Sequence, residues 1–203
     1  LGFYRGKRWE QSEETLGQIL QEFPEHPRAN IARLYYARTL SVREKYQQAR
    51  LEFQKFIQSN PDGKDLADAR YRLGECSYFL KDYPAAVEQL TVYLQGHPGH
   101  TLSNWAALLL GDSHVALKRY QEAIDILMPL PEDQTNASIL ADARFSLGKA
   151  MEGLNRVPEA LEYYKAVVVE KNATPAPRAL NRIATIQFLA ASYPDAASSF
   201  EQL

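Results

Sequence analysis

Small residues recur along this chain at a fixed interval. Glycines stand 37 residues apart, at Gly74, Gly111 and Gly148. Each is followed twelve residues later by an alanine, and the same interval of twelve separates two further pairs of alanines: Ala37 and Ala49, Ala184 and Ala196. A register held through five repeats is typical of a repeat architecture. Two antiparallel helices need small residues where they cross closely, so the pattern predicts a helical solenoid.

Within one repeat, the apolar residues are spaced for two helices. Intervals of three, four and seven separate Ala69, Leu73 and Leu80, and likewise Tyr83, Val87, Leu90 and Leu94. These intervals fit a period of 3.6 residues and not the alternation of a strand. Asp82 is expected to be the N-cap of the second helix, and Pro84 lies in its first turn, where a missing N–H costs little.

The same pattern predicts five helix pairs after a partial leading repeat. The predicted ranges are 30–42 with 45–59, 66–81 with 83–96, 102–118 with 120–129, 136–154 with 157–171, and 177–191 with 193–203. Pro129 and Pro131 are expected to shorten the second helix of the third pair. Gly111 is expected to be a close helix contact that tolerates alanine, whereas Gly111→Leu should overpack by about 1–3 kcal/mol or more.

The repeats resemble the tetratricopeptide repeat family. The matching residues are Leu-Gly at 73–74, 110–111 and 147–148, the aromatic-x-x-Ala that opens each second helix, and the closing prolines Pro24, Pro61 and Pro98. The resemblance implies an all-α fold, a right-handed α-α superhelix of antiparallel helix pairs. We expect one array over 1–203: a partial repeat 1–29, repeats 30–66, 67–103, 104–140 and 141–176, and a partial repeat 177–203. Because both ends fall within a repeat, the chain is expected to be a piece of a longer protein.

The repeat length points to a subclass of that family. The usual repeat has about 34 residues, whereas here it has 37 or 36. The longer turn between repeats resembles bacterial cell-envelope proteins of the family, which favours the periplasm or cell envelope over the cytoplasm.

Composition excludes several classes of partner. The formal net charge is −2 and no long run of Lys or Arg occurs, so we expect neither nucleic acid nor an anionic membrane surface as partner. No apolar run approaches the roughly 20 residues that span a bilayer.

The single cysteine, Cys76, excludes an internal disulfide. The sequence does not determine the oligomeric state.

No residue pattern points to catalysis or to a cofactor. His97 and His100 flank Pro98 and Gly99, but no Cys or carboxylate stands at metal-ligand spacing nearby, so a surface turn is preferred over a metal site. No nucleophile motif or phosphate-binding loop occurs. We therefore expect a protein that is not an enzyme and holds neither cofactor nor metal.

The resemblance implies that ligands contact the second, fifth, ninth and twelfth positions of each first helix, on the concave side. Apolar residues at these positions, expected to form an exposed strip, are Tyr71, Trp105, Leu108 and Phe145. Acidic residues around them are Asp68, Glu75, Asp112 and Asp142, and Tyr78 and Lys149 complete the predicted groove. An exposed aromatic strip suits the anchor residues of a partner.

Three functions are compatible with these features. The preferred one is a non-catalytic scaffold that binds a peptide or protein segment in its concave groove. The alternatives are a structural module that self-associates, and a regulatory arm of a larger protein whose catalytic part lies elsewhere.

Overall fold

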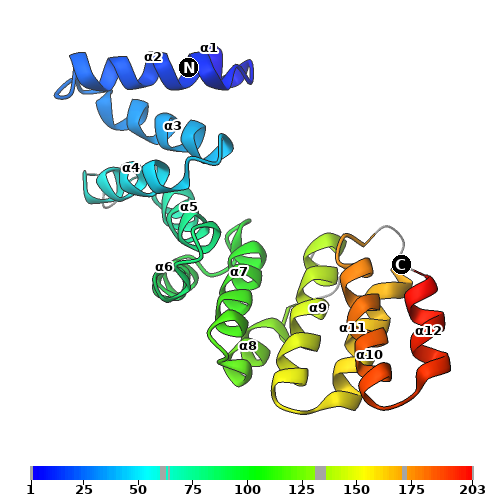
Figure 1. Ribbon diagram of the computed structural model, residues 1–203. Helices are drawn as coiled ribbons and strands as arrows, with labels where there is room; N and C mark the ends of the chain where they lie inside the picture. Colours follow the sequence, from blue (N-terminus) through cyan, green and yellow to red (C-terminus); the bar gives the residue numbers. More distant parts are fainter. Residues whose placement is uncertain (1, 60–62, 64, 131–135, 171–172, 203) are drawn as a thin grey trace. The chain divides into compact units, whose positions relative to one another are not determined.

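The computed structural model describes residues 2–59, 63, 65–130, 136–170 and 173–202. These residues form twelve helices and no strand (Figure 1), which confirms the all-α prediction. The chain divides into two compact units, unit 1 (Leu1–Leu109) and unit 2 (Leu110–Leu203).

Unit 1 contains six helices and the first half of a seventh. They are α1 (Gly2–Arg5), α2 (Trp9–Glu22), α3 (Ala29–Val42), α4 (Tyr46–Ser59), α5 (Leu66–Phe79), α6 (Tyr83–Gly96) and α7 (Ser103–Ala116). Each helix packs on the next along the chain from α1 to α6, and Figure 1 shows the members of each pair running antiparallel. The core beside α3 and α4 includes Leu34, Leu40, Phe53 and Phe56, all fully or almost fully buried.

Unit 2 contains the second half of α7 and five further helices. They are α8 (Tyr120–Leu127), α9 (Ala137–Gly153), α10 (Val157–Val169), α11 (Ala176–Leu189) and α12 (Tyr193–Glu201). We call α3, α5, α7, α9 and α11 the first helices, and α4, α6, α8, α10 and α12 the second helices. Their ends agree with the predicted ranges to within two residues. α8 ends two residues before Pro129, as expected, whereas Pro61 and Pro131 lie outside the described residues.

The turn inside each pair uses one residue in the left-handed conformation. These residues have φ between 54° and 60° although none is glycine: Lys7, Glu44, Lys81, Lys118, Asn155 and Ala191. In the turn after α3, the N–H of Glu44 donates to the carbonyl of Ser41, and the N–H of Lys45 donates to the carbonyl of Leu40. These two bonds define a Schellman cap, which satisfies the last carbonyls of the helix. The predicted N-cap also forms, since Asp82 Oδ1 accepts from the N–H of Ala85 at 3.4 Å.

The recurring glycines allow the two helices of a pair to touch. A Cβ at Gly74 would stand 2.7 Å from Leu90 Cδ2, and a Cβ at Gly148 would stand 2.5 Å from Tyr164 Cε1. A Cβ at Gly111 would meet Leu127 more closely still, and Leu127 is 2% exposed. Because a buried leucine has little room to move, the structure argues against the expectation that Gly111→Ala is tolerated.

Candidate partner-binding face

The predicted groove positions lie on one side of each first helix, which we call the first-helix face. On α5 they are Asp68, Tyr71, Glu75 and Tyr78, spaced so that one side of a helix presents all four. On α9 the corresponding residues are Asp142, Phe145, Lys149 and Glu152. The two sets belong to unit 1 and unit 2 respectively.

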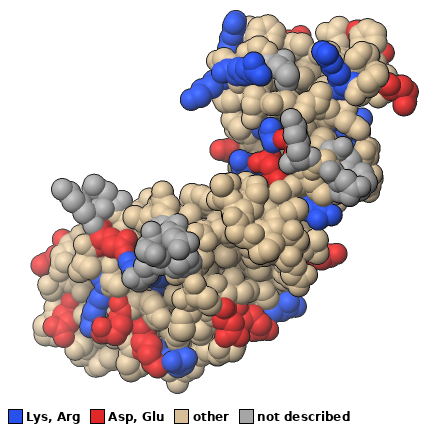
Figure 2. All heavy atoms as spheres, turned by 180° about the vertical axis from the view of Figure 1, so that it is seen from behind, with Lys and Arg blue, Asp and Glu red and all other residues tan. Residues whose placement is uncertain are grey.

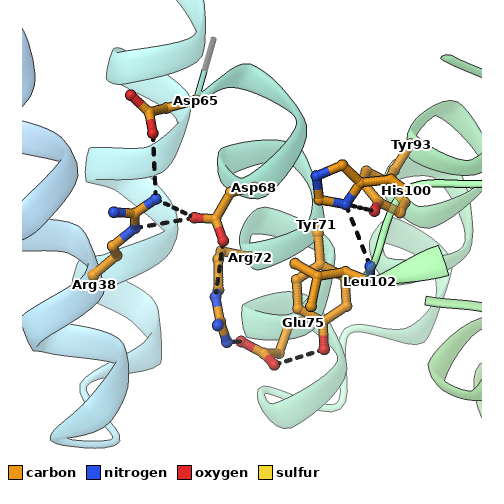
Figure 3. A network of polar contacts seen from close by, with 9 residues as sticks. All are labelled: Arg38, Asp65, Asp68, Tyr71, Arg72, Glu75, Tyr93, His100 and Leu102. Atoms are coloured by element: carbon orange, nitrogen blue, oxygen red, sulfur yellow. Dashed lines mark hydrogen bonds and ion pairs between the residues drawn. The ribbon is translucent and has the colours of Figure 1, made fainter. Parts of the chain in front are cut away.

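In unit 1, charged side chains on this face form a chain of ion pairs (Figure 3). Arg38 of α3 donates to Asp68 Oδ2 from Nε at 3.0 Å and from a terminal guanidinium nitrogen at 2.8 Å, and also lies 3.7 Å from Asp65. Arg72 lies 3.8 Å from Asp68 and donates to Glu75 at 2.8 Å. Asp68 and Glu75, both predicted to contact a partner, therefore already hold arginines of this chain.

Tyr71 lies beneath this chain of charges and is not exposed. Its ring packs on Tyr93 of α6, with ring centroids 5.8 Å apart, and only 3% of the residue is accessible. Its hydroxyl donates to Glu75 Oε1 at 2.9 Å, and Arg72 covers the ring at 5.3 Å. Burial, reinforced by the Glu75 carboxylate, raises the pKa of the Tyr71 hydroxyl, which therefore stays protonated.

Two adjoining hollows open on the first-helix face of unit 1. One has a volume of about 250 Å³ and is lined by Tyr71, Arg72, Glu75, Leu102 and Trp105. The other has about 200 Å³ and is lined by Tyr4, Arg38, Ser41, Val42, Asp68 and Arg72. Arg72 borders both hollows, and Trp105 is 37% exposed. This part of the face thus offers an accessible indole beside a hollow.

In unit 2 the same face carries a different arrangement of charges. Ser146 Oγ donates to Asp112, and Lys149 Nζ lies 3.6 Å from the same carboxylate. Burial and the nearby Asp112 raise the pKa of Asp142, and the cations of Arg178 and Lys149 only partly oppose this rise. Two of the predicted acidic residues therefore repel each other, which raises the energy of the ionised Asp142.

A third hollow, in unit 2, has a volume of about 400 Å³. Its lining residues are Val115, Tyr120, Lys149, Glu152, Gly153 and Arg182. Glu152 accepts hydrogen bonds from two side chains, the guanidinium of Arg182 with its Nε at 3.1 Å and the Tyr164 hydroxyl at 3.0 Å. The ion pair of Glu152 and Arg182 therefore borders the hollow, and Lys149 is also part of its lining.

The expected exposed strip of four apolar side chains is wrong in three of its members. Tyr71, Leu108 and Phe145 are 3%, 4% and 5% exposed, and only Trp105 is accessible. The reason is packing within the helix pair: the Phe145 ring rests on Tyr164 of α10, as the Tyr71 ring does on Tyr93. Whether these four residues contact a partner stays a prediction.

Other groups that could carry chemistry are held in structural roles. The N–H of Leu102 donates to His100 Nδ1 at 3.3 Å, and the same nitrogen lies 2.8 Å from the Tyr93 hydroxyl (Figure 3). Burial raises the pKa of the Cys76 thiol to about 12, which makes it a poor nucleophile. Within the described ranges, no three His, Cys, Asp or Glu side chains gather as a metal site would require.

The outer surface agrees with the near-neutral composition. Figure 2 shows both signs of charge on the drawn face of each unit, in keeping with a formal net charge of −2. None of the helices in the described part of the chain has the length and apolar character needed to cross a membrane.

The sequence did not predict the ion pairs of Arg38 and Arg182 or the hollow of unit 2. Arg38 and Arg182 each reach a carboxylate 30 residues away, on the neighbouring first helix. That separation recurs in the sequence and could have indicated the pairing. Gly153 also stands out, because the matching residue of α5 is Phe79.

Comparisons with known proteins agree with this architecture. A tetratricopeptide repeat family model matches residues 2–64, and the model of an outer membrane lipoprotein family, YfiO, matches residues 43–200. No curated protein sequence matches the chain significantly.

Solved structures show the same fold at low sequence identity. A tetratricopeptide repeat protein from Parabacteroides merdae is 14% identical, with a TM-score of 0.76 over 99% of this chain and 74% of its own. MamA from Desulfovibrio magneticus is 18% identical, with a TM-score of 0.69 over 85% of this chain and 92% of its own. A Rap protein complexed with Competence and Sporulation Factor is 14% identical, with a TM-score of 0.68 over 92% of this chain and 57% of its own.

The family follows from the extent of the match. The YfiO model spans most of the chain, a tetratricopeptide repeat model matches its start, and the helix pairs have the fold of a solved tetratricopeptide repeat protein. The protein therefore belongs to the tetratricopeptide repeat proteins and, among them, to the outer membrane lipoprotein family YfiO.

Proposed function

We propose that this protein is a non-catalytic scaffold that binds a segment of another protein along its first-helix faces. The observation that carries the proposal is Trp105, an accessible indole beside a hollow of about 250 Å³. Tryptophan is among the residues that most often dominate binding energy, especially where a pocket next to it excludes water.

The remaining predicted site residues have distinct parts in this proposal. Trp105 supplies the anchor in unit 1, and the buried Tyr71, Leu108 and Phe145 stiffen the helices that present the face. The carboxylates of Asp112 and Asp142 repel each other, so we expect the partner segment to place basic residues beside them. The other proposed contacts are Asp68, Glu75, Tyr78 and Lys149.

The comparisons support this proposal at the level of the family. Membership in an outer membrane lipoprotein family favours a location at the bacterial cell envelope. The Rap protein was solved as a complex with Competence and Sporulation Factor, so a fold of this kind can hold a ligand.

Site-specific photo-crosslinking in the native cells would test the proposal. A benzophenone amino acid at position 105 should crosslink to a discrete partner, whereas the same group at Glu88, which is exposed on α6, should not. The purified partner should then bind Trp105→Ala more weakly by about 2 kcal/mol or more. The variant should melt like the parent, because Trp105 is partly exposed.

Two results would contradict the proposal. One is crosslinking from position 88 but not from position 105. The other is an unchanged affinity of Trp105→Ala for the partner. Either result would rule out Trp105 as the anchor and remove the observation that carries the proposal.

Self-association is the second candidate, and one observation favours it. Large apolar side chains are exposed on α11 and at the start of α12: Phe188 (56%), Leu189 (78%) and Tyr193 (59%). Exposed apolar residues that gather on neighbouring helices often mark an interface. Light scattering over a range of concentrations would reveal a dimer, and Leu189→Glu should then return it to a monomer.

A further inference from the structure

We propose that the hollow of unit 2 binds the side chain of a tyrosine carried by the partner segment. This inference rests on the proposed scaffold function and names the chemistry of one contact. The hollow lies beside Tyr120, the first residue of α8, and Gly153, the last residue of α9.

Gly153 brings the Tyr120 ring directly against the backbone of α9. A Cβ at Gly153 would meet the ring atoms Cζ, Cε1 and Cε2 of Tyr120, so the ring takes the space of a side chain. Among the described residues, no other aromatic ring packs on Tyr120. One aromatic surface therefore borders a hollow of about 400 Å³.

In unit 1, the matching positions hold two aromatic side chains of the chain itself. The matching residues are Tyr46, the first residue of α4, and Phe79, the last residue of α5. Their rings stack with centroids 4.8 Å apart and planes 18° from parallel. Tyr78 packs on Phe79 in turn, at 5.5 Å. In unit 2 the positions of Tyr78 and Phe79 hold Glu152 and Gly153, and the Tyr120 ring lies against the backbone of Gly153. The hollow borders this ring, which has, among the described side chains, no aromatic partner of the kind that Phe79 gives Tyr46.

The rim of the hollow explains why the missing ring should carry a hydroxyl. Its lining includes the charged groups of Lys149, Glu152 and Arg182. A phenol can donate to the Glu152 carboxylate and accept from either cation, whereas phenylalanine would leave these groups without a substitute for water. A tyrosine of this chain already forms such a hydrogen bond, since the Tyr164 hydroxyl donates to Glu152 at 3.0 Å.

We expect a protein segment to supply the tyrosine, because the hollow continues the first-helix face of unit 2. Lys149 and Glu152 are the ninth and twelfth positions of that face, and both line the hollow. A segment lying along α9 would pass its entrance.

The test compares three acetylated and amidated pentapeptides, Gly-Ser-Xaa-Ser-Gly, in which Xaa is Tyr, Phe or Leu. Each is titrated into the isotope-labelled 203-residue chain, and amide shifts are followed in correlation spectra. The Tyr peptide should shift the Gly153 amide saturably. The Phe peptide should bind several-fold more weakly, and the Leu peptide should give no saturable shift.

Matched variants link the binding to this hollow. Gly153→Phe introduces the residue found at position 79. It should weaken binding of the Tyr peptide by about tenfold or more, because the new ring displaces or covers Tyr120 and the peptide loses its aromatic contact. Tyr120→Leu should weaken it similarly while conserving most of the volume, and it decides the matter if Gly153→Phe unfolds.

Three outcomes would overturn the inference. They are equal binding of the Leu and Tyr peptides, equal binding of the Phe and Tyr peptides, and unchanged binding by both Gly153→Phe and Tyr120→Leu. The full partner separates this failure from that of the scaffold function: loss of affinity in Trp105→Ala but not in Gly153→Phe would overturn the tyrosine contact alone.

Discussion

In unit 1, the ninth position of α3 holds Arg38, which donates two hydrogen bonds to Asp68 on α5. In unit 2, the matching positions, 74 residues further along, hold Asp112 and Asp142. One pair attracts, whereas the other repels and raises the pKa of Asp142. The helices are alike in both units, so the difference lies in the side chains that face outward from the same scaffold.

The aromatic residues differ between the units in the same sense. In unit 1, the rings of Tyr46 and Phe79 stack on each other, whereas in unit 2 a hollow lies beside the matching residues, Tyr120 and Gly153. In unit 1, Asp68 has an arginine partner and the Tyr46 ring has an aromatic partner. In unit 2, Asp112 repels the Asp142 carboxylate, and a hollow borders the Tyr120 ring. This difference teaches that repeats with the same helix pairs can carry different side-chain partners at matching positions.

Breaking the shared scaffold should have the largest effect. Gly111→Leu inserts a side chain against the buried Leu127, so it should destabilise the protein by about 3 kcal/mol or more. The midpoint of urea unfolding measures this loss. Gly96→Ala is the control, because only Arg70 lies near its Cβ, at 3.5 Å. If Gly111→Leu unfolds at the parent's midpoint, the close helix contact is not what holds the pair together.

Giving unit 1 the charges of unit 2 should have the next largest effect. Arg38→Asp removes two charged hydrogen bonds and places a third carboxylate beside Asp65 and Asp68, so it should cost about 2 kcal/mol. Arg38→Met, which keeps the aliphatic stem, separates the loss of charge from the loss of packing. An equal loss in both variants would show that repulsion has no part, and would weaken the comparison between the units.

The turns shared by both units offer a stabilising change. Ala191 has φ of 59°, where an L-residue costs about 1–2 kcal/mol relative to glycine. Ala191→Gly removes that strain but loosens the unfolded chain, so a net gain of about 0.5–1 kcal/mol is expected. Thermal unfolding measures the gain. The reverse change, Gly99→Ala at φ 75°, should destabilise the protein. A lower melting temperature for Ala191→Gly would contradict the strain argument.

Relieving the repulsion in unit 2 should have the smallest effect, and one that depends on pH. Because the folded protein raises the pKa of Asp142, the folded state binds its proton more tightly than the unfolded state does. The contribution of this group to stability is therefore greatest in acid and is lost as pH rises through the raised pKa.

Asp142→Asn should accordingly stabilise the protein at neutral pH and change little below about pH 3.8. Urea unfolding at several pH values measures the difference. The matching change in unit 1, Asp68→Asn, should destabilise the protein at neutral pH because Arg38 loses its acceptor charge. A stabilising effect of both variants would erase the difference between the units.

Much of the fold could be predicted because it depends on local rules. The interval of 37 residues, the small residues at the helix contacts and the cap at Asp82 are short-range patterns, and the helix ends followed from them to within two residues. The candidate site was harder to predict. Position along a helix indicates which side a residue lies on, but not whether the neighbouring helix covers it.

Tyr71 and Trp105 illustrate that limit. Both lie on the predicted face, yet Tyr71 is buried against Tyr93, whereas Trp105 is accessible. The sequence by itself determined the all-helical repeat and its register, because backbone hydrogen bonds and helix contacts repeat with the chain. Only the tertiary structure decided which carboxylates have arginine partners on a neighbouring helix, which rings are covered and where a hollow lies beside Gly153, since these depend on side chains of different helices meeting.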